Sequence, residues 1–212
     1  FLNPTNTLVV YTSAIKADHI LYEFFINKNH TVIKRSELLE LITKPYNVIA
    51  IAGTHGKTTI TIMLTHILQT AGLYPTAFFG GISKNYHTNY LYPNNLPETS
   101  STPLMIVEAD EYDKSFLRLS PVILLISSLD VDHKDTYSSE DHMLDAYYQL
   151  FVNTLQNCHH SVYKNINALK IDSCPVFMPQ EVQKKMSEYL ERKKLKNPNK
   201  KQPVIVKNQA MF

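Results

Sequence analysis

The chain has 212 residues, of which 44% are hydrophobic and 19% charged, and its formal net charge is +2. This composition is typical of a globular chain with one ordinary core and a partial second unit. No run approaches the roughly 18 uninterrupted apolar residues of a membrane span, and the first residues do not form a secretion signal. We therefore expect no membrane span and a cytoplasmic location. Cys158 and Cys174 lack a CxxC spacing and are expected to be free thiols.

Positive charge gathers toward the C-terminal end of the chain. Residues 164–212 hold 11 Lys and Arg against 4 Asp and Glu, a net +7, which leaves −5 for residues 1–163. The basic run 191–196 could contact nucleic acid, but a solvated helix end is the interpretation we favour, so no nucleic-acid partner is expected. The chain begins with Phe1 rather than Met, which indicates that it is part of a longer protein.

The first 45 residues alternate short strands with helices. The expected elements are a strand at 8–11, a helix at 18–28, a strand at 31–33 and a helix at 36–42. Pro45 lies in a plausible linker, because proline ends the preceding helix and stiffens the connection. A first domain is therefore expected at residues 1–45.

The main domain is expected at residues 46–165. It opens with an almost wholly apolar run at 47–52, as expected of a parallel strand that is covered on both faces. A helix should follow at 57–71, where Gly72 ends a run of apolar positions at three- and four-residue steps: Ile60, Met63, Leu64, Ile67, Leu68 and Ala71.

Further strands are expected at 76–79, 104–108 and 122–127, and residues 85–102 should form a loop or a short hairpin. A second helix should begin near Ser138, with Asp141 completing a weak capping box. It carries one apolar stripe that should pack into the core: Met143, Leu144, Tyr147, Tyr148, Phe151 and Val152.

A third segment, residues 166–212, is expected to be a basic tail that is helical and then loosely ordered. A strand at 161–163 precedes it, an amphipathic helix covers 179–194, and residues 197–203 have the composition of a loosely attached segment.

The first chemically informative segment joins the apolar strand at 47–52 to the helix at 57–71. Its residues are Gly53, Thr54, His55, Gly56, Lys57, Thr58 and Thr59. A Gly-containing loop at this place directs backbone N–H groups and the helix dipole at one point, where an anion is stabilised. Lys57 would face the β- and γ-phosphates, and the Thr58 hydroxyl would bind Mg²⁺. The motif is a shortened G-x-x-G-K-T-T form, because Ile51 stands where the usual first glycine would be.

Acidic residues follow the next apolar strand. The run from Glu108 to Asp113 holds four carboxylates in six residues, at the carboxyl end of a strand, where α/β sheets bind ligands. A solvated turn is the alternative for such a run taken alone. Downstream of a phosphate loop, a metal site is the better interpretation, since Mg²⁺ takes oxygen ligands.

A third polar segment follows the strand at 122–127. It runs from Ser127 to Asp135 and contains His133, which can ligate a metal while adjacent Asp residues orient it. An isolated Asp-x-His is more often structural. In series with the two preceding segments, we interpret His133 as a functional residue.

These three segments resemble, in order and spacing, the motifs of the Mur ligases. The matching stretches are 52–59, 108–113 and 132–137. His55 in the loop is similar to the branch that acts on UDP-N-acetylmuramate, which comprises the L-alanine-adding enzymes and the murein peptide ligases, and the run 115–121 favours the former. Residues 12–15 resemble the end of that family's UDP-binding domain, and Gly80-Gly81 resembles its glycine pair beyond the loop helix.

The resemblance implies an α/β fold, with a parallel sheet that contains the phosphate loop and is flanked by helices, preceded by the end of a Rossmann-like UDP-binding domain. It implies an ATP-dependent amide-bond ligase of peptidoglycan precursor synthesis, with UDP-N-acetylmuramate and L-alanine as substrates and ATP and Mg²⁺ as cofactors. By motif position, Gly53 to Thr59 would bind ATP, and Thr58, Glu108 and His133 would bind Mg²⁺. Lys57, His55 and His133 would be catalytic, with His55 near the acceptor carboxylate.

Three departures from the family set the alternatives. The Gly-rich UDP loop expected upstream of Phe1 is absent, residues 158–212 hold no recognisable third domain, and Ser128 replaces the usual Asn. One hypothesis is a piece of an active ligase. Another is a truncated protein that binds nucleotide without catalysis. A third is a murein peptide ligase or a folylpolyglutamate-type relative with a different acceptor. The oligomeric state is left open.

Overall fold

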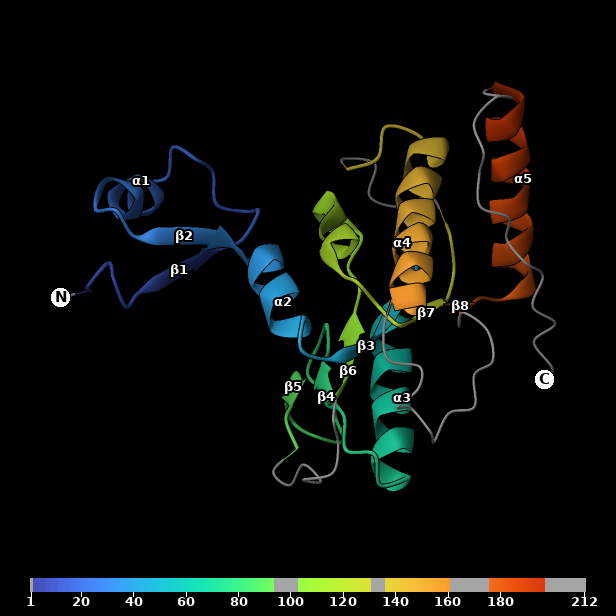
Figure 1. Cartoon of the computed structure of the whole chain (residues 1–212), viewed down its shortest axis with the longest axis horizontal. Helices are drawn as coiled ribbons and strands as arrows, with labels where there is room; N and C mark the ends of the chain where they lie inside the picture. The colour runs from blue at the N-terminus through green and yellow to red at the C-terminus, as the bar shows by residue number, and fades with distance from the viewer. Residues whose placement is uncertain (1, 94–102, 131–135, 161–175, 197–212) are drawn as a thin grey trace. The chain divides into compact units, whose positions relative to one another are not determined.

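The computed structural model of the chain describes residues 2–93, 103–130, 136–160 and 176–196, which belong to two compact units (Figure 1). Unit 1 is Phe1–Lys44 and unit 2 is Pro45–Phe212. Among the described residues, no helix is long and apolar enough to cross a membrane. The predicted strand at 161–163 and the tail beyond residue 196 lie outside the described residues.

Unit 1 has the predicted βαβα order. Its elements are β1 (Leu8–Tyr11), α1 (Ile20–Asn27), β2 (Thr31–Lys34) and α2 (Arg35–Thr43). β1 and β2 pair in parallel, with Leu8 opposite Thr31 and Tyr11 opposite Lys34. The side chain of His19 caps α1 by accepting a hydrogen bond from the Leu21 N–H group at 3.3 Å. α1 buries none of its residues, so this unit has little core of its own.

Unit 2 is built on one six-stranded sheet with helices on both faces. Its elements are β3 (Asn47–Ala52), α3 (Lys57–Thr70), β4 (Thr76–Phe78), β5 (Tyr90–Leu91), β6 (Leu104–Glu108), the 3₁₀ helix η1 (Tyr112–Arg118), β7 (Ile123–Ile126), α4 (Glu140–His160), β8 (Val176–Phe177) and α5 (Gln180–Lys196). The strand order is β5-β4-β6-β3-β7-β8. All neighbours pair in parallel except β5, which is antiparallel to β4 at one edge, so the sheet is mixed rather than wholly parallel.

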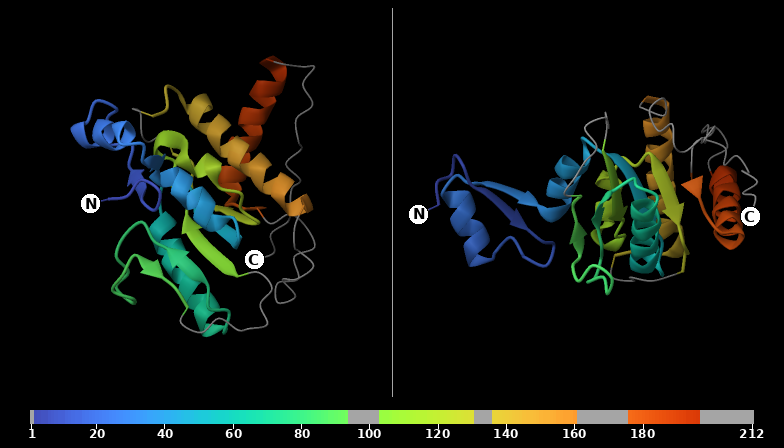
Figure 2. Two further views of the ribbon diagram at one scale, coloured as in Figure 1. Left: turned by 60° about the vertical axis from the view of Figure 1, so that its left-hand side comes forward. Right: turned by 90° about the horizontal axis from the view of Figure 1, so that it is seen from below.

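β3 is the centre of the sheet and is buried along its whole length, as its apolar sequence predicts. Ile49 and Ile51 share one apolar cluster with Leu68 of α3, which covers that face of the sheet. α4 packs against β7 and η1 on the other face (Figure 2). The two faces together bury the strand that leads into the phosphate loop.

The predicted helix after the loop is confirmed, but its apolar residues lie only partly on its buried face, to which Leu68 belongs. Met63 and Ile67 are 58% and 59% exposed, whereas Thr61 and Thr65 are fully buried. The Thr61 and Thr65 hydroxyls donate to the carbonyl oxygens one turn earlier, at 2.8 and 2.7 Å. Because these hydroxyls are satisfied within the helix, threonine packs against the sheet without an unpaired polar group.

Gly72 ends α3 as predicted. It adopts a positive φ of 79°, and its N–H group donates to the Gln69 carbonyl at 2.9 Å. The N–H group of Leu73 donates to the Leu68 carbonyl, also at 2.9 Å. These two bonds form a Schellman motif, which uses the last carbonyls of the helix.

α4 buries most of its predicted apolar stripe, including Met143, Leu144 and Tyr147. Its N-terminus differs from the prediction by one residue. Ser139, not Ser138, caps the helix by accepting a hydrogen bond from the His142 N–H group at 3.1 Å.

Residues 176–196 add to the same fold. β8 extends the sheet next to β7, and α5 packs along α4 (Figure 1). Asp145 of α4 pairs with Lys193 and accepts a hydrogen bond from the Tyr189 hydroxyl of α5. Burial acts to raise the pKa of Asp145, but these two contacts outweigh it and the pKa is lowered. α5 is therefore a docked part of unit 2, and the sequence did not predict β8.

Candidate phosphate-binding site

The three segments singled out in the sequence begin at the carboxyl ends of three adjacent strands. β3 lies between β6 and β7, with Ile51 opposite Glu108 and Ala52 opposite Ile126. The ladder continues past the strands, since the Ser127 N–H group donates to the Ala52 carbonyl at 2.9 Å. The loop, the carboxylates and the serine segment therefore meet at one edge of the sheet, where open α/β sheets bind ligands.

The two glycines of the loop hold backbone conformations that other residues rarely adopt. Gly53 has a φ of 125°, and a Cβ atom there would lie 2.8 Å from the backbone nitrogen of Ser128. Gly56 has a φ of 80° and stands directly before Lys57, the first residue of α3. The chain thus turns sharply from β3 into the helix, and the first N–H groups of α3 open toward the loop.

Lys57 is folded into the loop by three contacts. Its ammonium group donates to the Gly53 carbonyl at 2.7 Å and lies 3.0 and 2.8 Å from the two carboxylate oxygens of Glu111. The Lys57 side chain is 13% exposed and that of Glu111 is fully buried. The sequence placed Glu111 among the metal-binding carboxylates, whereas the structure places it beside the loop lysine.

Thr58 and Glu108, both predicted as metal ligands, lie in contact with each other. The Thr58 hydroxyl donates to Glu108 Oε1 at 3.0 Å, and the Gly80 N–H group donates to Oε2 at 2.7 Å. A Cβ atom at Gly80 would lie 2.6 Å from Glu108 Cδ, so only glycine allows this approach. The position of Gly80 thereby explains the first glycine of the pair noted in the sequence.

Ser128 is bonded to the loop itself. Its hydroxyl oxygen accepts a hydrogen bond from the His55 N–H group at 2.9 Å and lies 2.9 Å from the Thr54 hydroxyl oxygen. The Asp130 N–H group donates to the same Thr54 hydroxyl at 3.0 Å. The serine that departs from the family pattern therefore supports the middle of the loop.

The remaining predicted residues stand at the surface of the loop or outside the described residues. The His55 ring lies 3.7 Å from the Asp130 carboxylate, and both side chains are mostly exposed. Thr59 is exposed on the first turn of α3. His133 belongs to residues 131–135, which the structure does not describe, so its place as a metal ligand stays a prediction.

Two tyrosines lie close to the buried carboxylate. The Tyr137 hydroxyl donates to the main-chain carbonyl of Glu111 at 2.8 Å. Tyr147 of α4 is fully buried, and that burial, with the charge of Glu111 as the second cause, raises the pKa of its hydroxyl. Tyr147 therefore stays neutral at physiological pH.

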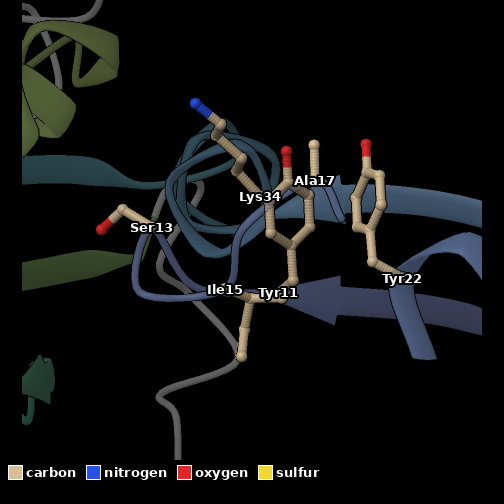
Figure 3. A pocket seen from close by; sticks show the side chains of 6 residues that line it. All are labelled: Tyr11, Ser13, Ile15, Ala17, Tyr22 and Lys34. Carbon is tan, nitrogen blue, oxygen red and sulfur yellow. The ribbon is translucent and has the colours of Figure 1, made fainter. Parts of the chain in front are cut away.

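Unit 1 contains a separate pocket of about 230 Å³. Figure 3 shows its lining side chains, which are Tyr11, Ser13, Ile15, Ala17, Tyr22 and Lys34. The rings of Tyr11 and Tyr22 meet edge to face, 5.1 Å apart. Partial burial, followed by the nearness of Tyr22, raises the pKa of Tyr11. One cation and several hydroxyl groups thus face the pocket.

A glycine loop between a central parallel strand and a helix, a lysine inside it, and a Thr-carboxylate pair beside it define an α/β protein of the phosphate-loop class. Residues 51–194 match the model of the Mur ligase middle domain. The chain belongs to the Mur ligase family.

Curated relatives agree with this assignment. The chain is 44% identical over 147 residues to a UDP-N-acetylmuramate-L-alanine ligase of Cytophaga hutchinsonii, covering 69% of this chain and 31% of that protein. It is 46% identical over 136 residues to the ligase of the same name from Flavobacterium johnsoniae, covering 64% and 29%. The chain therefore spans about a third of the length of the relatives that it matches.

Solved structures show the same fold. A UDP-N-acetylmuramate-alanine ligase from Thermotoga maritima matches with a TM-score of 0.57 and 28% identity, over 73% of this chain and 35% of that one. A UDP-N-acetylmuramate:L-alanyl-gamma-D-glutamyl-meso-diaminopimelate ligase from Neisseria meningitides matches with a TM-score of 0.65 and 22% identity, over 84% and 55%. The predicted α/β fold is confirmed.

Proposed function

We propose that this chain is the nucleotide-binding part of an ATP-dependent ligase that joins L-alanine to UDP-N-acetylmuramate. The observation that carries the proposal is the phosphate loop with Lys57 inside it and the Thr58-Glu108 pair beside it. The identity of 44–46% to ligases of this name supports the choice of substrates. The reaction belongs to the cytoplasmic synthesis of peptidoglycan precursors.

The chemistry explains why such an enzyme needs a phosphate loop. A carboxylate is a poor electrophile, so one of its oxygens attacks the γ-phosphorus of ATP, which forms an acyl phosphate and releases ADP. The alanine amine then attacks the acyl carbon and forms a tetrahedral intermediate. Loss of inorganic phosphate and of one amine proton leaves the amide bond. Positioning and charge stabilisation supply most of the rate in such phosphoryl transfers.

The residues of the loop have distinct proposed roles. The backbone N–H groups of residues 53–59 and the N-terminus of α3 bind the phosphates of ATP. The Lys57 ammonium stabilises negative charge on the transferring phosphoryl group. His55, exposed at the rim of the loop, donates a hydrogen bond to the acceptor carboxylate. Hydrogen bonds of Ser128 and Asp130 to the loop stabilise its conformation.

Thr58 and Glu108 fit a divalent cation, because a hydroxyl oxygen and a carboxylate oxygen stand 3.0 Å apart beside the loop. These two residues, with His133, would hold Mg²⁺. The ion would bring positive charge to the phosphate oxygens and offset their mutual repulsion. The Gly80 N–H group donates to Oε2 of Glu108, so Oε1 would be the oxygen available to the ion.

The metal role of Glu108 predicts a defined loss in one variant. In Glu108→Gln, the Mg²⁺-dependent gain in ATP affinity should fall by roughly tenfold, because a neutral amide is a poor ligand for this ion. Isothermal titration calorimetry of ATP binding, once with Mg²⁺ and once with EDTA, measures that gain. Asp110→Asn is the matched control, since an Asn oxygen can still accept the Tyr112 N–H bond at 3.0 Å. Equal losses in both variants would argue against a specific role of Glu108.

Unit 1 is proposed as the end of the UDP-binding domain, with its lysine and tyrosine hydroxyls available to the diphosphate or the sugar.

The whole reaction is tested on the protein that carries this chain together with its flanking sequence. We expect phosphate release that requires ATP, L-alanine and UDP-N-acetylmuramate together. Activity only with a peptide in place of L-alanine would assign the protein to the murein peptide ligases. Nucleotide binding without turnover would support the non-catalytic alternative.

A further inference from the structure

Glu111 is the buried charged group that the proposed function does not use. We propose that Glu111 is a positioning residue that holds the Lys57 ammonium in the nucleotide-free loop and competes for it with the phosphates of an entering nucleotide. The inference rests on the proposed nucleotide function of the loop. It assigns to Glu111 control over how tightly that nucleotide is held.

The Lys57 ammonium group is surrounded by acceptors, two of them hydrogen-bonded to it and the third in ion-pair contact. An ammonium group has three N–H donors and no acceptor. In the structure it has three acceptors within reach: the Gly53 carbonyl at 2.7 Å and the Glu111 carboxylate oxygens at 3.0 and 2.8 Å. A phosphate oxygen can bind this ammonium group only by replacing or sharing one of these contacts.

Of the contacts that Lys57 makes, the one with the Glu111 carboxylate is the one that a bound phosphate group would weaken. The Gly53 carbonyl belongs to the backbone of the loop, whose shape Ser127 and Ser128 fix from the neighbouring strand. Glu111 contributes a negative charge, and an incoming phosphate group is also negative. The two anions therefore compete for one cation, while the neutral carbonyl adds no such charge.

Glu111 cannot leave when the nucleotide arrives. Its side chain is fully buried, and its main-chain carbonyl accepts hydrogen bonds from the Tyr137 hydroxyl at 2.8 Å and from the Lys114 N–H group at 3.1 Å. Turning the carboxylate to solvent would require moving η1 and the residues that anchor it. Glu111 therefore stays beside Lys57 and continues to neutralise part of the ammonium charge, in a buried position where charges are poorly screened.

We therefore expect the affinity of the loop for nucleotide to be moderate. With Glu111 in place, Lys57 stands ready inside the loop without a nucleotide, but part of its charge is already neutralised. A neutral group at position 111 should leave the full charge to the phosphates. We expect nucleotide to bind more tightly and to leave more slowly, so Glu111 favours exchange of ADP for ATP.

Two variants test this competition by calorimetry with MgADP and MgATP on the 212-residue chain. Glu111→Gln should bind both nucleotides about tenfold more tightly than the wild type, because the full charge of the Lys57 ammonium group is then available to the phosphates. Glu111→Asp, which withdraws the carboxylate from Lys57 by one methylene, should show a smaller gain. If Gln at this position prevents folding, the Asp variant alone decides the sign. Unchanged or weaker binding in a folded variant would overturn the inference, because a merely structural Glu111 can only weaken the site.

A double-mutant cycle tests whether Glu111 acts through the lysine. In a Lys57→Met background, Glu111→Gln should produce no gain in affinity, since the cation for which the anions compete is gone. The same tenfold gain in that background would also overturn the inference. A failure of the proposed function can be distinguished from a failure of this inference, because in the former case the wild type itself would not bind MgATP. A wild type that binds through Lys57, with no gain in either Glu111 variant, refutes only the competition.

Discussion

Lys57→Ala is expected to weaken MgATP binding to this chain by at least about 30-fold. Hydrogen bonds between charged groups contribute roughly 1.5–3 kcal/mol each, and the lysine is the cation at the centre of the loop. Isothermal titration calorimetry on the wild type and the variant measures the ratio directly. Equal affinities would remove the loop from the nucleotide site.

The same substitution has a second effect that must be separated from the first. It removes the Lys57 ammonium group from its ion pair with the fully buried Glu111 carboxylate, and the loss of one partner of a buried ion pair costs about 3–5 kcal/mol. The control is the double variant Lys57→Ala/Glu111→Gln, in which both charges of the pair are removed. We expect it to unfold at a higher temperature than Lys57→Ala alone and to bind MgATP as weakly. Recovery of full affinity in the double variant would show that Lys57→Ala acted only through folding.

Gly53→Ala is expected to give the largest loss of stability of any glycine substitution in the loop. A Cβ atom there would meet Ser127 Oγ and lie 2.8 Å from the Ser128 backbone nitrogen, at a φ of 125°. Backbone strain and overpacking each cost about 1–3 kcal/mol, so we expect a loss of roughly 3 kcal/mol or more. Thermal unfolding followed by circular dichroism should show a midpoint lower by about 10 °C.

Gly72→Ala separates the two contributions to this loss. Gly72 also has a positive φ, of 79°, but a Cβ atom there meets nothing within 4 Å. Its substitution should cost about 1 kcal/mol from backbone strain alone. If the two alanine variants unfold at the same temperature, the contact with the serine segment after β7 contributes nothing to the stability difference, and that segment does not confine the loop.

Strong local patterns made part of this molecule predictable. The continuous apolar run of β3, the glycines and lysine of the loop, and the carboxylate after β6 are local features, and their order along the chain predicts that they meet at one sheet edge. The helix end at Gly72 follows from the conformation of a single residue. In each case a few adjacent residues contain the whole physical reason.

The features that the sequence missed depend on contacts between distant residues. Glu111 is identical in type to its acidic neighbours, and only its burial beside Lys57, 54 positions away, distinguishes it. Thr61 and Thr65 appeared polar, although bonds to their own helix make them suitable for the core. β8 consists of Val176 and Phe177 alone, too short to produce an alternating pattern. The proposed ligand role of His133 remains a prediction, because that residue lies outside the described part of the chain.

The residue-by-residue pairing of β3 with β6 and β7 also determines where the chain can change length. Side chains alternate between the faces of a strand, so inserting or deleting one residue in β6 would bring Val107 or Ala109, respectively, to the place of Glu108 and turn the carboxylate to the opposite face. Deletions and insertions should therefore be excluded from these three strands in any functional variant. The turn after Gly72, where added atoms meet open space, can accept them. The strand register thus fixes the positions of the site residues, and we expect variation in chain length at the opposite end of the sheet from the loop.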